Sequence, residues 1–121
     1  MENLKAMNET RSIDTLLDWL KNATEKRESI NPSKFVEAAT YMVILMGEEH
    51  EKLSKLKQEI AKMKVSLLKE YDKVNKVTLM VEASDDYREM KNQEARIANI
   101  EEYIRLAKLF GRLKSEELKN N

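Results

Sequence analysis

Apolar residues recur every three or four positions over most of the chain, the spacing of one face of an α-helix. The first such stretch predicts a short helix over residues 12–28, with Ser12 as its N-cap. Residues 1–11 are polar, and we expect them to form a flexible N-terminus. The apolar face of the short helix consists of Ile13, Leu16, Leu17 and Leu20.

A much longer apolar stripe follows Asn31-Pro32, a pair that suits the N-cap and first position of a helix. It predicts a helix over residues 32–75. Residues 38–46, AATYMVILM, are apolar on nearly all sides, so we expect this part to be buried on more than one side. The stripe runs through Phe35, Ala39, Met42, Met46, Leu53, Leu56, Ile60, Met63, Leu67, Tyr71 and Val74.

Residues 76–84 interrupt the helical pattern. Val77, Leu79 and Val81 occupy alternate positions, which predicts a short extended segment. A helix is the alternative, because Val81 lies seven residues after Val74. An exposed strand at a bend needs a partner, so the extended interpretation predicts that residues 77, 79 and 81 form a homo-oligomer interface.

The last amphipathic stretch begins at Ser84, an N-cap residue followed by two aspartates that suit the first turn. It predicts a helix over residues 85–118. The predicted fold class is therefore all-α, with one helical domain over residues 12–121. In this domain a short N-terminal helix packs near a long, coiled-coil-like antiparallel helical hairpin, and the extended segment forms the bend.

The composition supports long helices with a thin core. Of the 121 residues 36% are charged and 6% aromatic, and there are only two glycines and one proline. Two thin apolar stripes bury little area per residue, which favours a homo-oligomer. Cysteine is absent, no apolar run approaches a membrane span, and the first residues lack a signal-peptide pattern, so we expect a cytoplasmic protein.

Charge is balanced overall but unevenly distributed along the chain. The 22 basic residues equal the 22 acidic ones in number. Residues 51–76 carry eight lysines and four acidic residues, a net charge of +4, whereas residues 82–102 have a net charge of −4. In the predicted hairpin these two segments lie opposite each other, so we expect them to pair.

One row of lysines points away from the apolar stripe. Lys55, Lys62, Lys69 and Lys76 recur every seven residues, and Lys73 lies close to the same row. The common explanation is a solvated helix face, where lysine is frequent. The functional interpretation is a cationic track that contacts the phosphates of a nucleic acid through these five lysines.

Catalytic and metal-binding motifs are absent from the sequence. His50 is the only histidine, and Ser54 stands where a zinc-protease motif requires its second histidine. Gly47 stands where a di-iron motif requires glutamate. We therefore predict no cofactor, no small-molecule substrate and no enzymatic activity.

The layout resembles the UvsY-type recombination mediators of phages. The residues that carry this resemblance are Lys34, Glu37-Ala38-Ala39, the apolar residues 42–46, Lys64-Val65, Thr78-Leu79, Ala83 and Asp85-Asp86. The resemblance covers residues 32–110. It implies a ring-like homo-oligomer that binds single-stranded DNA and helps a RecA-like recombinase to displace single-strand-binding protein. The family's basic positions fall near residues 68–70, where only Lys69 carries a positive charge here.

Two functional hypotheses follow. The first is a non-catalytic, phage-type recombination or replication accessory protein that binds single-stranded DNA as a homo-oligomer. The alternative is a small helical protein-binding adaptor or inhibitor, such as a phage anti-defence factor, that uses the AATYMVILM surface or the N-terminal helix.

Overall fold

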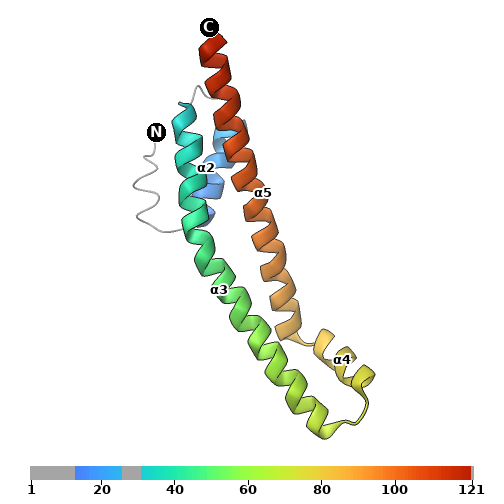
Figure 1. The fold of residues 1–121 in the computed structure, drawn as a ribbon. Helices are drawn as coiled ribbons and strands as arrows, with labels where there is room; N and C mark the ends of the chain where they lie inside the picture. The colour runs from blue at the N-terminus through green and yellow to red at the C-terminus, as the bar shows by residue number, and fades with distance from the viewer. Residues whose placement is uncertain (1–12, 26–30, 121) are drawn as a thin grey trace. The chain divides into compact units, whose positions relative to one another are not determined.

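The computed structural model describes residues 13–25 and 31–120, and Figure 1 shows the course of its helices. The described residues contain helices and no strand, so the all-α fold class is confirmed. The helices are α2 (Ile13–Glu25), α3 (Pro32–Glu70), α4 (Val74–Glu82) and α5 (Asp85–Asn120). The predicted cap at Ser12 lies outside the described residues.

Asn31 caps the start of α3 as predicted. Its Oδ1 accepts hydrogen bonds from the Ser33 backbone N–H at 3.0 Å and from the Ser33 hydroxyl at 2.9 Å. Its carbonyl oxygen accepts the Lys34 N–H at 2.9 Å. Pro32 follows at the first helical position, where its missing N–H costs nothing.

The predicted extended segment is wrong: residues 74–82 form helix α4. Val77 and Val81 are four residues apart and both buried, whereas Leu79 between them is 67% exposed. This is the burial pattern of a helix, since a strand would place all three side chains on one face. The helix that the sequence left as the alternative is therefore the correct interpretation, although Val74 itself is 57% exposed.

Ser84 joins α4 to α5 and confirms the predicted cap. Its hydroxyl donates to the Val81 carbonyl oxygen at 2.6 Å and accepts the Tyr87 N–H at 3.2 Å. One side chain thus satisfies a terminal carbonyl of α4 and a free N–H of α5. Asp85 and Asp86 follow in the first turn, at the positive end of the helix dipole.

The chain divides into two compact units, of which the first comprises the described parts of residues 1–47 and 98–121. Its core lies between α2 and the adjoining parts of α3 and α5. Phe35 of α3 contacts Trp19 of α2 and Phe110 of α5, with ring centroids 5.8 and 5.9 Å apart. The residues of this unit that are most completely buried are Leu16, Leu20, Ala38, Ala39, Met42, Ile100 and Ala107.

Gly111 allows α5 to approach the start of α3 closely within the first unit. A Cβ atom at this position would lie 3.1 Å from Val36 Cγ2 and 3.2 Å from the Pro32 carbonyl oxygen. Gly47, by contrast, has nothing within 4 Å of such an atom. Of the two glycines, only Gly111 is therefore required by packing.

The AATYMVILM segment is covered on only part of its circumference. Ala38, Met42 and Leu45 are buried, as expected for the side that faces the unit's core. Val43 and Ile44 are 51% and 65% exposed, so burial does not extend around this part of α3.

The second unit, residues 48–97, contains the rest of α3, all of α4 and the start of α5. Here the apolar stripe of α3 is only half-buried at Leu53, Leu56, Ile60, Met63 and Leu67. Val77, Val81, Met90 and Ile97 supply the buried apolar side chains of this unit. The apolar stripe of α3 therefore remains partly in contact with water along this unit.

Candidate nucleic-acid interface

The most strongly charged feature of the second unit is residues 52–69 of α3. This segment carries six lysines and a single acidic residue, Glu59. Every one of the six lysines is exposed. They are Lys52, Lys55, Lys57, Lys62, Lys64 and Lys69, and we call them the α3 lysines.

Three of the predicted DNA-binding lysines lie on this helix, and two do not. Lys55, Lys62 and Lys69 form an exposed row with a spacing of seven residues. Because α3 ends at Glu70, Lys73 lies in the connection and Lys76 lies in α4. The seven-residue row on α3 therefore ends at Lys69.

Lys76 instead contacts an aromatic ring. Its Nζ atom lies 4.8 Å from the centroid of the Tyr71 ring, within range of a cation–π interaction. Tyr71 is half-buried. One face of this ring is thus covered by the ammonium group of Lys76.

The α3 lysines have few counter-charges. Lys55 pairs with Glu51 and Lys62 with Glu59, each at 3.4 Å on the same helix. Side chains this exposed gain about 0.3–0.5 kcal/mol from such a pair. No ion pair to any residue within the described segments is made by Lys57, Lys64 or Lys69.

The expected pairing between the basic and acidic segments does not occur among the described side chains. The ion pair that joins α3 to α5 has the opposite polarity, with Glu49 on α3 and Arg96 on α5. Seven cations pair instead with an acidic residue three or four positions away on their own helix: Lys34, Lys55, Lys62, Arg88, Lys91, Arg105 and Lys114. The positive charge of the α3 lysines is therefore not cancelled by α5.

Glu49 is a buried carboxylate at the contact between α3 and α5, only 5% exposed. Its Oε2 accepts hydrogen bonds from Gln93 Nε2 at 2.7 Å and Arg96 Nε at 3.0 Å, and its Oε1 accepts one from an Arg96 terminal nitrogen at 3.2 Å. Burial alone would raise the pKa of Glu49. Hydrogen bonds from Arg96 and Gln93, with the charges of Arg96 and Lys52, outweigh burial and hold this pKa below its ordinary value.

Sequence reasoning missed this network, although both stripes contained a signal. On α3 the apolar stripe has a gap between Met46 and Leu53, and Glu49 stands in the phase that fills it. On α5 a similar gap before Ile97 is filled by Gln93. Polar residues in matching gaps of two stripes indicate a buried polar contact between them.

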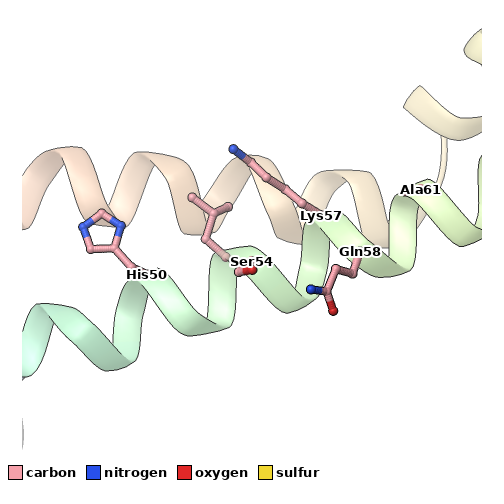
Figure 2. A pocket seen from close by; sticks show the side chains of 6 residues that line it. His50, Ser54, Lys57, Gln58 and Ala61 are labelled. Atoms are coloured by element: carbon pink, nitrogen blue, oxygen red, sulfur yellow. The ribbon is translucent and has the colours of Figure 1, made fainter.

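His50 lies at the edge of a shallow hollow on the surface of α3, which Figure 2 shows from close by. The hollow is lined by His50, Leu53, Ser54, Lys57, Gln58 and Ala61, all from this one helix. His50 itself is exposed. Within residues 13–25 and 31–120, no group of three or more histidine, aspartate or glutamate side chains is placed to hold a metal ion.

The predicted oligomer interface keeps one accessible member. Val77 and Val81 are buried within the chain, at 0% and 6% exposure, and Leu79 is exposed. Since α4 replaces the expected strand, strand pairing between subunits no longer supports this interface.

Comparison with models of protein families, with curated proteins and with solved structures found no match to this chain. Among the described helices, none is both long enough and apolar enough to cross a membrane.

Proposed function

We propose that the protein is a non-catalytic accessory factor that binds single-stranded DNA through the α3 lysines. One observation carries this proposal: an 18-residue segment of α3 contains six exposed lysines and only one acidic residue, Glu59. No acidic side chain described on α5 pairs with these lysines. Regularly spaced ammonium groups with little counter-charge suit a phosphate backbone.

The expected mode of binding is contact with phosphates, without reading of the base sequence. The row of Lys55, Lys62 and Lys69 covers 15 residues, so its first and last members are about 21 Å apart along the helix axis. Few aromatic side chains near this row could stack on nucleic-acid bases. Tyr71 is half-buried, and one face of its ring is occupied by Lys76. Binding is therefore expected to depend strongly on salt and weakly on sequence.

A salt titration with a fluorescently labelled single-stranded oligonucleotide tests this function. We expect Lys64→Gln/Lys69→Gln, which removes two α3 lysines that make no ion pair within the described segments, to weaken binding. It should also reduce the slope of log K against log salt by about 1.4, since each single-strand phosphate contact contributes about 0.7. The matched control is Lys34→Gln/Lys91→Gln, two lysines that each pair with a glutamate three residues on. Absence of binding by the unaltered protein at low salt would refute the function.

The larger proposal is a phage-type recombination or replication factor that acts as a homo-oligomer, with α3 and α5 as the arms of an antiparallel, coiled-coil-like hairpin. Contacts of Glu49 with Arg96 and of Phe35 with Phe110 support the pairing of these two helices in each unit. The half-buried stripe of the second unit and the exposed Leu79 leave apolar surface for a further copy of the chain. Molar mass measured by light scattering, with and without DNA, tests the assembly.

A protein-binding adaptor is the second candidate, favoured by the exposed side of α3 in the first unit. Val36, Val43 and Ile44 are each at least half exposed. Thr40 adds no free hydroxyl proton, because its Oγ1 donates to the Val36 carbonyl oxygen at 2.9 Å. A partner captured from nuclease-treated lysate by the unaltered protein, and lost with Val43→Lys/Ile44→Lys, would favour this candidate.

A further inference from the structure

A second group of cations lies on α5, in the first unit of the chain. Arg105, Lys108 and Arg112 are spaced by three and four residues, so they share one side of the helix. All three are exposed. Residues 103–116 carry four basic residues and one acidic residue, so this part of α5 is positively charged.

Two of these cations have no bound counter-charge. Arg105 makes two hydrogen bonds with Glu102 on the preceding turn, which occupy its guanidinium group. Lys108 and Arg112 form no ion pair with any residue in the described segments. Lys114, two residues after Arg112, pairs with Glu117 at 3.4 Å. Lys108 and Arg112 are therefore the charges left for an anionic ligand.

The surface around these two side chains is hollowed. A groove of about 440 Å³ lies between the start of α3 and α5, and two cations, Lys108 and Arg112, line it together with one carboxylate, Glu116. An adjoining hollow of about 380 Å³ is lined by Lys108, Leu109, Arg112 and Arg105. Lys108 and Arg112 border both. Gly111 contributes only backbone to the lining of the groove, since this residue has no side chain.

This arrangement suits a phosphate group better than an apolar peptide. The guanidinium of Arg112 can donate two parallel hydrogen bonds to phosphate oxygens, and the Lys108 ammonium adds a point charge one turn away. Leu109 is the apolar contact offered beside them in the smaller hollow. A sugar or a base next to the bound phosphate can pack on it.

We propose that Lys108 and Arg112 form a second phosphate-binding site for the same single-stranded DNA, separate from the α3 lysines. This inference rests on the proposed function, because it adds contacts to a ligand that the α3 lysines bind. The two sites lie in different units of the chain, so each can be removed without altering the other.

The test is a salt titration of oligonucleotide binding by Lys108→Gln/Arg112→Gln. We expect weaker binding and a slope of log K against log salt that is lower by about 1.4, the value for two lost single-strand phosphate contacts. The control is Arg88→Gln/Lys91→Gln, which removes one arginine and one lysine from the same helix, each paired with an acidic residue. Circular dichroism at the assay temperature checks that every variant keeps its helices.

Each outcome decides the inference. Loss of slope in Lys108→Gln/Arg112→Gln, with the control unchanged and binding retained in Lys108→Arg/Arg112→Lys, supports the second site. Unchanged binding by the glutamine variant, while Lys64→Gln/Lys69→Gln loses affinity, overturns this inference and leaves the proposed function intact. No binding by the unaltered protein overturns both.

Discussion

Replacing Glu49 by glutamine tests whether the buried contact between α3 and α5 stabilises the second unit. The substitution preserves size and removes the charge. The Glu49 carboxylate accepts hydrogen bonds from Gln93 Nε2 and from two nitrogens of Arg96. Glutamine can accept only through one oxygen, and its NH2 group would face other donors.

The expected cost is about 2 kcal/mol of the free energy of unfolding, the value for hydrogen bonds to a charged group. It falls short of the 3–5 kcal/mol (roughly) that breaking a fully buried ion pair costs, because the Arg96 side chain is 35% exposed and can turn to water. For a chain of this size, 2 kcal/mol corresponds to a decrease of about 8 °C in the melting temperature.

Urea denaturation followed by circular dichroism measures this cost, at one fixed protein concentration because self-association would add to stability. The pH dependence supplies a second test. The hydrogen bonds from Arg96 and Gln93 and the nearby positive charges lower the pKa of Glu49 in the folded chain below its ordinary value in the unfolded one. The stabilisation is therefore fully present above that value, and it is lost as the pH falls through the folded-state pKa.

The difference in the free energy of unfolding between the unaltered protein and Glu49→Gln should thus be constant from pH 7 to pH 5 and decrease below about pH 4. Glu51→Gln is the control, since it removes an exposed pair with Lys55 and should cost less than about 0.5 kcal/mol. The reasoning fails if Glu49→Gln matches this control at pH 7, or if its cost is the same at pH 7 and pH 3.5.

Three further predictions concern packing, and thermal melts check each of them. Gly47→Ala should stabilise the chain by about 1 kcal/mol through helix propensity, whereas Gly111→Ala should give no gain because its Cβ would crowd the start of α3; equal gains would contradict the close approach. Val77→Ala should cost about 2 kcal/mol and Leu79→Ala less than about 0.5, and equal costs would indicate a strand rather than α4. Phe35→Ala, which removes the ring between α2 and α5, should cost about 3–5 kcal/mol, and a cost below that of Val77→Ala would contradict its central place.

The helices were predictable because the periodicity of apolar residues persists over many turns. The caps at Asn31 and Ser84 were predictable as well, since each combines a polar acceptor with a suitable following residue. The segment of α4 was predicted wrongly because nine residues are too few for periodicity to separate a helix from a strand. Burial of Val77 beside exposed Leu79 depends on tertiary contacts, which the local pattern does not contain.

The candidate site was only partly predictable. The exposure of Lys55, Lys62 and Lys69 followed from their phase relative to the apolar stripe. The end of α3 before Lys73 did not, because no proline or glycine marks it. Net charges of whole segments predicted that residues 51–76 would pair with residues 82–102, yet pairing depends on individual side chains. Glu49 and Arg96 reverse the expected polarity at the contact itself.

The junction at Ser84 connects α4 and α5 tightly. Only Ala83 and Ser84 separate the two helices, and the Ser84 hydroxyl bonds to both of them. A rotation of α4, for instance when a ligand binds Lys76, would therefore also move the first turn of α5, because no flexible linker separates the two helices. Ser84→Gly would remove both of these hydrogen bonds and make the connection flexible, so that α4 could rotate without moving α5.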